Sequence, residues 1–210
     1  MLPPMKSTRI RGLHYWSRYQ ADLRIDFNGF YLSDPSGGVL VDPMPLTPEE
    51  LAELRDLGGA RTIVVTNADH LRAAEELKEE CGARLVAPAC DRDLLDGVAV
   101  DEWFTDADGL GPGLSERWEV HWLRGGKRPL EAAIYVTAER LWIFGDAVRS
   151  HESGRLRLLP DPKIADRSAL EASIKALAGR EVQAVLLGDG DCIFNGARGA
   201  LDAFLEGLSA

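Results

Sequence analysis

Two blocks of predicted β-strands, each joined to strand–helix units, restrict the fold of this chain more than any other feature. Both blocks show period-two apolar patterning and turn residues, and the first contains the turn Ser-Asp-Pro-Ser-Gly-Gly at residues 33–38. The predicted strands are Leu23–Phe27, Phe30–Leu32 and Gly38–Asp42, then Trp118–Leu123, Ala132–Val136 and Leu141–Phe144. A wholly parallel sheet would not explain such hairpins, whereas two packed sheets with helices outside would bury both blocks.

Helix signals lie between and after these blocks. Thr47 is an N-cap residue followed by Pro48 and by Glu50 at the third helical position, which predicts a helix to about Leu57. A later helix is predicted to open at Asp166 or Ser168, with Glu171 available as its capping partner. The remaining predicted strands are Thr62–Val65, Arg84–Ala87 and Ala184–Leu187. The remaining predicted helices are His70–Glu80, closed by Gly82, and Gly196–Leu208.

Length and composition favour one globular domain over residues 1–210, because 45% of the residues are hydrophobic and 28% are charged. A net charge of −10 disfavours nucleic acid and anionic lipid as partners. No apolar run approaches the roughly 20 residues that span a bilayer. The three cysteines are far apart and no secretory segment is evident, so we expect reduced thiols in a cytoplasmic protein. No sequence feature indicates the oligomeric state.

Four predicted strands end beside carboxylates, at Asp42, at Asp69 with His70, at Asp146 and at Asp189. Each carboxylate has an ordinary structural explanation when it is considered singly. Asn67 or Asp69 can cap the helix that follows, and Gly-Asp pairs are common in turns. A functional site is favoured only when the four strand ends are considered together and in this order.

Taken together, these strand ends resemble the motifs of the metallo-β-lactamase superfamily, and the resemblance covers roughly residues 23 to 205. The segment Thr66-Asn-Ala-Asp-His70 is similar to the family's His-x-His-x-Asp-His motif with only its last two residues kept. The other matching segments are the strand pair that ends at Asp42-Pro43, the Gly-Asp strand end at Asp146, and the late Gly-His-Gly segment with Asp189 at the histidine position. The resemblance implies an α+β fold, a four-layer αββα sandwich with a metal site along one edge.

The departures from the family pattern restrict the chemistry that the resemblance implies. The first two histidines of the motif fall on Val65 and Asn67, and the family's mid-chain histidine falls near Gly126. A dinuclear zinc site is therefore not expected. The equivalents of the remaining ligands, which would hold at most one divalent ion, are Asp69, His70, Asp146 and Asp189.

Such an oxygen-rich set suits manganese, iron(II) or magnesium at least as well as zinc. With a bound water as nucleophile, Asp69 or Asp146 would orient it as a base, and Asn67 and Asp42 would support the ligands. The first hypothesis is therefore a divergent metal-dependent hydrolase that acts on a small molecule of unknown class.

A metal-free hypothesis stands beside it. Carboxylates that converge without a cation raise one another's pKa, because like charges disfavour ionisation. Lys127, next to the lost loop histidine, could supply the missing positive charge, with help from Arg128 or Arg149. The protein would then be a ligand-binding or structural member of the family that holds no metal and hydrolyses nothing.

Overall fold

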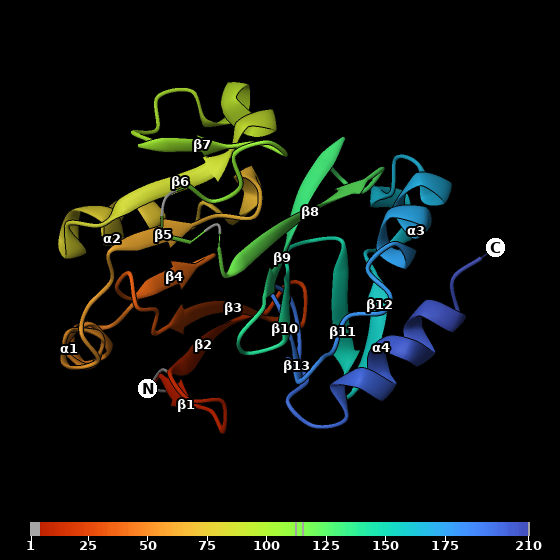
Figure 1. Cartoon of the computed structure of the whole chain (residues 1–210), viewed down its shortest axis with the longest axis horizontal. Helices are drawn as coiled ribbons and strands as arrows, with labels where there is room; N and C mark the ends of the chain where they lie inside the picture. The colour runs from red at the N-terminus through yellow and green to blue at the C-terminus, as the bar shows by residue number, and fades with distance from the viewer. Residues whose placement is uncertain (1–4, 112, 115, 210) are drawn as a thin grey trace. The chain divides into compact units, whose positions relative to one another are not determined.

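The structure is a computed structural model that describes residues 5–111, 113–114 and 116–209 (Figure 1). Two compact units divide the chain, unit 1 with residues 1–114 and unit 2 with residues 115–210. Each unit consists of a sheet and two α-helices together with shorter elements. The single domain predicted over residues 1–210 stays a prediction.

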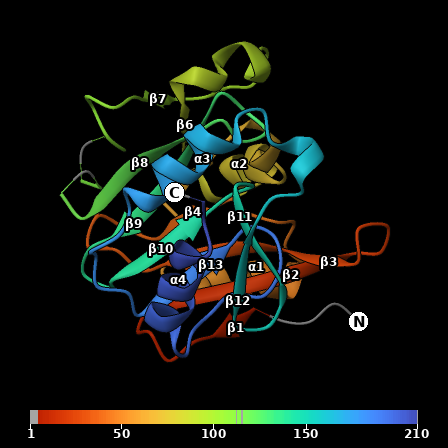
Figure 2. The same ribbon diagram turned by 90° about the vertical axis from the view of Figure 1, so that its right-hand side faces the viewer.

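Unit 1 contains a seven-stranded sheet whose strands follow one another in chain order. Strands β1 to β4 pair antiparallel, and β4 to β7 pair parallel. The long β2–β3 hairpin is seen in red and orange in Figure 2. The bounds are β1 Lys6–Ser7, β2 Leu13–Gln20, β3 Ile25–Leu32, β4 Val39–Val41, β5 Thr62–Val64, β6 Arg84–Pro88 and β7 Glu102–Phe104.

The helices of unit 1 pack their apolar side chains into one core with the sheet. Leu54 of α1 and Leu77 of α2 join Leu40, Ile63 and Leu85 in this cluster. Burying side chains of this size stabilises the fold by about 1.5–3 kcal/mol each. The helical segments are α1 Pro48–Asp56, η1 Ala68–His70, α2 Ala74–Cys81 and η2 Ala89–Leu95.

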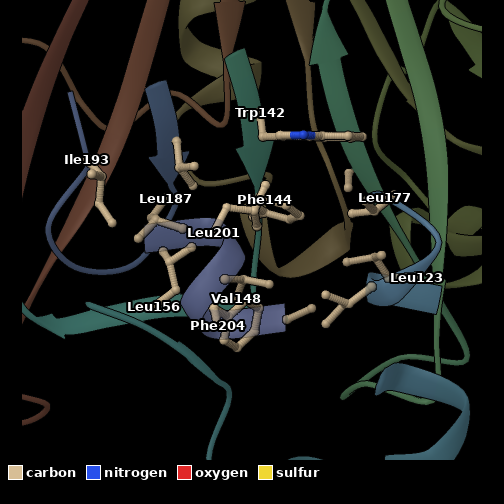
Figure 3. Close-up of a cluster of buried hydrophobic side chains, with 14 of the residues drawn as sticks. Leu123, Trp142, Phe144, Val148, Leu156, Leu177, Leu187, Ile193, Leu201 and Phe204 are labelled. Atoms are coloured by element: carbon tan, nitrogen blue, oxygen red, sulfur yellow. The ribbon is translucent and has the colours of Figure 1, made fainter. Parts of the chain in front are cut away.

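Unit 2 contains a four-stranded sheet in the order β13–β10–β9–β8 and a separate hairpin, β11–β12. Trp142 and Phe144 of β10 pack with Leu201 and Phe204 of α4 in its core, as Figure 3 shows. The bounds are β8 Trp118–Arg124, β9 Leu130–Val136, β10 Leu141–Phe144, β11 Val148–Glu152, β12 Arg155–Leu158, η3 Asp161–Lys163, α3 Arg167–Lys175, β13 Ala184–Leu187 and α4 Ala197–Glu206.

Several predicted boundaries agree with the structure, and one helix start was wrong. Strands β10 and β13 have the predicted bounds, and Gly82 ends α2 in the left-handed conformation. The helix predicted from His70 begins instead at Ala74, because Arg72 adopts a φ of 42° that no α-helix contains. Glu171 does not cap α3; Asp166 alone accepts the backbone N–H of Ala169.

Strands β1, β2 and β7 and the β11–β12 hairpin were missed by the sequence analysis. Strand β2 contains the buried polar residues Ser17 and Arg18, so its apolar alternation is broken. None of the helices that the structure describes is long and apolar enough to cross a membrane.

The capping box of α1 also anchors a buried ion pair. Thr47 Oγ1 accepts the N–H of Glu50, and the Glu50 carboxylate accepts the N–H of Thr47 at 2.7 Å. The same carboxylate contacts Arg18 of β2 at 2.5 Å, and the two side chains are 4% and 8% exposed. Glu50 therefore connects the start of α1 to the sheet.

We expect Glu50→Gln to lower the free energy of unfolding by about 3 kcal/mol, because it removes one charge of a buried pair. Glu49→Gln is the matched control, since Glu49 is exposed in the same helical turn, and it should cost less than about 0.5 kcal/mol. Urea unfolding of both variants measures the difference. Equal stabilities of the two variants would contradict the role given to Glu50.

Candidate functional site

Asp42 follows β4 directly, and its carboxylate accepts several hydrogen bonds. Its side chain is fully buried, and its backbone adopts a φ of 46°, which is uncommon for a residue other than glycine. The carboxylate accepts the N–H of Thr66 at 2.8 Å and the hydroxyl of Thr66 at 2.7 Å. His70 Nδ1 lies 2.7 Å from its second oxygen.

These partners explain the ionisation of Asp42. Burial opposes the charged form, but the charge and hydrogen bond of His70, the charge of Arg72 and the Thr66 N–H together hold the pKa of Asp42 below its ordinary value. Asp42 is therefore a carboxylate at neutral pH, and it accepts hydrogen bonds only.

The Asp42 carboxylate in turn determines the state of the His70 ring. Because Asp42 can only accept, Nδ1 of His70 carries a proton and donates it to the Asp42 carboxylate. Arg72 Nη2 lies 3.3 Å from Nε2 and donates to it. His70 is 2% exposed, so Asp42 and Arg72 hold both ring nitrogens inside unit 1.

Arg72 is itself held firmly. Its Nη1 donates to the carbonyl oxygen of Asn28 at 2.8 Å and to that of Asp42 at 3.3 Å. Its guanidinium carbon lies 5.0 Å from the centre of the Phe27 ring, a cation–π distance. A guanidinium bonded in this way stays beside His70 rather than moving freely in solvent.

The rest of the 66–70 loop is ordered by side-chain caps. Asn67 accepts the N–H of Asp69 at 2.9 Å, and the buried Asp91 of η2 accepts the N–H of Ala68 at 2.6 Å. Asn67 is fully buried, whereas Asp69 is exposed on η1. These two side-chain caps fix the backbone conformation of the loop.

Asp146 and Asp189 of unit 2 lie at the same end of two paired parallel strands. Phe144 of β10 is in register with Leu187 of β13, and each aspartate follows its strand by two residues. Both carboxylates are buried, at 6% and 4% exposure. This half of the predicted ligand set is therefore brought together by the strand register.

Arg149 of β11 contacts both of these carboxylates. Its Nη2 lies 3.1 Å from Asp189 Oδ2 and 3.5 Å from Asp146 Oδ1, and its side chain is 8% exposed. A buried Glu131 accepts the N–H of Ala147 next to Asp146 at 3.0 Å. One guanidinium thus lies among the carboxylates at the ends of β10 and β13.

A close backbone approach brings Arg149 and Asp189 together. Ser150 and Gly190 form a parallel β-bridge, and Gly190 has a φ of 93°. A Cβ at position 190 would lie 1.7 Å from the carbonyl oxygen of Ser150, so only glycine fits there. The contact therefore depends on the main chain as well as on charge.

The other predicted residues have different surroundings. Lys127 is exposed, and the ion pairs described for Asp146 and Asp189 within unit 2 come from Arg149. Asp69 and His70 belong to unit 1, and Asp146 and Asp189 to unit 2. The meeting of these four side chains in one site stays a prediction.

The donors present do not fit a metal ion as they are arranged within each unit. The lone pair of His70 Nε2 accepts from Arg72, and the guanidinium of Arg149 lies between Asp146 and Asp189. In residues 5–111, 113–114 and 116–209, no group of three or more histidine, cysteine, aspartate or glutamate side chains is arranged to hold an ion.

Sequence reasoning missed Arg72, Asp91 and Glu131, and it gave Arg149 only a supporting role. Arg72 was placed within a predicted helix, and Arg149 lies on a strand that was not predicted. The signal that was available is the spacing: each arginine follows a candidate aspartate by three residues, Asp69 in one case and Asp146 in the other.

We expect Asp42→Asn to lower the free energy of unfolding by about 2–3 kcal/mol, because hydrogen bonds to a charged group are lost while asparagine tolerates the same left-handed backbone. Asp56→Asn, at an exposed position that ends α1, is the control. Urea unfolding gives the energies, and imidazole nitrogen NMR should show a proton on Nδ1 of His70 in the wild type. A proton on Nε2 instead would contradict the described hydrogen bonds.

Comparisons with known proteins agree with the fold expectation. The DIM-1 metallo-beta-lactamase shares 18% identity with a TM-score of 0.72, and the alignment covers 100% of both chains. A metallo-beta-lactamase from Pontibacter korlensis shares 18% identity at 0.70, covering 97% of this chain and 99% of that one. FIM-1 from Pseudomonas aeruginosa, in a mono-zinc form, shares 14% sequence identity with a TM-score of 0.71. The alignment covers 98% of this chain and 96% of that one.

These similarities confirm an α+β fold of the metallo-β-lactamase type. No match was found among curated proteins. The family model described as "Metallo-beta-lactamase superfamily" matches residues 5–208, nearly the whole sequence. The chain therefore belongs to the metallo-β-lactamase superfamily, as the order of its strand-end motifs predicts.

Proposed function

We propose that this protein is a metal-free, non-hydrolytic member of the superfamily that binds a small molecule. The observation that carries the proposal is the position of Arg149, whose guanidinium contacts both Asp146 and Asp189 in a buried setting. The guanidinium supplies one positive charge shared by two buried carboxylates, which would be costly to bury without a partner. Arg149 thereby takes the part that the sequence analysis gave first to Lys127.

The energetics of burial support the same assignment. Removing one partner from a buried charge pair costs about 3–5 kcal/mol, so a buried arginine is not easily displaced. An ion held by Asp146 and Asp189 would have to displace Arg149, whose own side chain is only 8% exposed. In unit 1 an ion on His70 would have to displace Arg72, which has three further contacts.

The chemistry of the ligand is limited by charge. The net charge of −10 argues against a polyanion such as nucleic acid, and a small molecule is the ligand class we propose. Among the similar structures, DIM-1 was also determined after exposure to ceftazidime, a small molecule, and this supports the ligand class by analogy only. A cytoplasmic location remains our expectation from the cysteines.

A second candidate, a hydrolase with one divalent ion at Asp69, His70, Asp146 and Asp189, is favoured by one observation. Metal-ligating histidines usually donate their other ring N–H to a carboxylate, and His70 donates Nδ1–H to Asp42 in this way. FIM-1 is similar in fold and was determined in a mono-zinc form. Manganese, iron or zinc would then be held by these four side chains.

Metal content distinguishes the two candidates. We expect protein purified without chelator or metal-affinity resin to carry no stoichiometric manganese, iron or zinc by mass spectrometry. Asp69→Ala and Asp146→Ala serve as the comparison variants. One ion per chain in the wild type that is lost in both variants would overturn the metal-free proposal and establish the second candidate.

Substitution of the two candidate cations tests which one neutralises the carboxylates. We expect Arg149→Met to lower the free energy of unfolding by about 3 kcal/mol and Lys127→Met by less than about 0.5 kcal/mol. Manganese should raise the melting temperature of the Arg149→Met variant but not that of the wild type, because the space between Asp146 and Asp189 becomes open to a cation. If Lys127→Met lowered the free energy of unfolding more than Arg149→Met, Lys127 and not Arg149 would be the residue that compensates the carboxylates.

A further inference from the structure

We propose that unit 2 carries a separate binding site for a small organic anion, in a cavity of about 620 Å³ between β12 and α4. Clefts of about 300–1,000 Å³ are the size that encloses small molecules in proteins. The cavity does not include Asp146, Arg149 or Asp189 in its lining, so this proposal is independent of the function proposed above.

The sequence of α4 explains why a cavity exists there. Ala200 and Ala203 of α4 and Gly207, which caps its C-terminus, line the cavity together with Phe204, so three of these four positions have little or no side chain. Strand β12 is an edge strand of its two-stranded sheet and lies beside α4 in both whole-chain views (Figures 1 and 2). The small residues leave open the space between the helix and the strand edge.

The floor of the cavity is apolar. Leu156 of β12 and Phe204 of α4 line it and also belong to the hydrophobic core of unit 2, where Figure 3 shows both side chains. Leu208 packs against the same core from the end of the chain. Glu171 accepts the N–H of Ser209 at 3.0 Å, which fixes the C-terminal turn at one end of the cavity.

The rim of the cavity carries the guanidinium groups of Arg155, Arg157 and Arg167 and the carboxylates of Asp161 and Glu171. Both carboxylates pair with Arg167, so the excess positive charge lies on the β12 side of the rim. Arg155 and Arg157 share a single carboxylate, Glu152, at 3.2 and 2.5 Å, so one positive charge on this side is in excess. Their side chains are 68% and 46% exposed. Exposed ion pairs contribute little to stability, so an anion can exchange for Glu152 at low cost.

An apolar floor beside the cationic β12 side of the rim suits an amphipathic anion. The carboxylate of such a ligand would pair with Arg155 or Arg157, and a short aliphatic body would lie against Phe204 and the small face of α4. We therefore assign the ligand class as a short-chain aliphatic carboxylate. The carboxylate of the ligand would fix its orientation, and its aliphatic chain would supply most of the contact area.

Hexanoate is a suitable probe, with acetate and hexanol as matched compounds that keep only its charge or only its body. We expect millimolar hexanoate to shift the backbone amide signals of Gly154, Leu156, Phe204 and Gly207 in NMR titrations of the full chain. Acetate and hexanol should bind at least about tenfold more weakly, because each lacks one half of the contacts.

Two pairs of variants complete the experiment. Ala203→Trp fills the cavity and should abolish the shifts, whereas Glu206→Trp adds the same bulk to α4 outside the lining and should not. Arg155→Ala with Arg157→Ala should weaken hexanoate about tenfold, and Arg140→Ala with Arg198→Ala, exposed arginines elsewhere in unit 2, should leave it unchanged. Absence of any shift, equal binding of hexanol, or unchanged binding to Ala203→Trp would overturn the proposal.

Discussion

The Asp42 carboxylate is the interaction on which the order of the 66–72 segment depends. It joins the end of β4 to the backbone and hydroxyl of Thr66 and to the ring of His70. With Asp42 in place, Nε2 of His70 faces Arg72, and Arg72 in turn contacts the backbone of β3 through Asn28. One buried anion thus holds a histidine and an arginine at the end of the parallel strands.

Unit 2 also contains a buried charged cluster, but there a central cation is surrounded by anions. There the central group is a cation, Arg149, and the groups that it holds are the carboxylates of Asp146 and Asp189. Buried charges persist only when a partner or a metal ion compensates for their lost hydration. In this chain the compensating partner of the two strand-end aspartates is an arginine, which contacts both of them.

Much of the fold was predictable because local signals agreed with burial. Strands β10 and β13 are uninterrupted apolar runs, and α1 begins at a complete capping box. Strand β2 was missed because Ser17 and Arg18 are buried there through tertiary partners, Asn28 and Glu50, that no local pattern reveals. The β11–β12 hairpin was missed because its charged residues mask the strand pattern.

The candidate site was predictable only as a set of strand-end positions. The sequence places Asp42 and His70 at two strand ends, but the φ of 46° at Asp42 and the 2.7 Å bond between them arise from the folded backbone. Arg72 carries a similar φ of 42°, which removed it from the predicted helix and placed it against His70. Backbone torsions of this kind leave almost no trace in residue patterns, since residues other than glycine seldom adopt them.

The close approach of Gly190 to Ser150 has a consequence for which charged residues this part of the chain can accept. Because the main chain sets the gap between positions 149 and 189, the spacing survives whichever residues occupy them. Gly190 keeps the two main chains at a fixed distance, and this distance does not depend on which side chains stand at positions 149 and 189. Mutational drift can therefore exchange one charged pair for another at this point without rebuilding the loop, provided that position 190 never acquires a side chain.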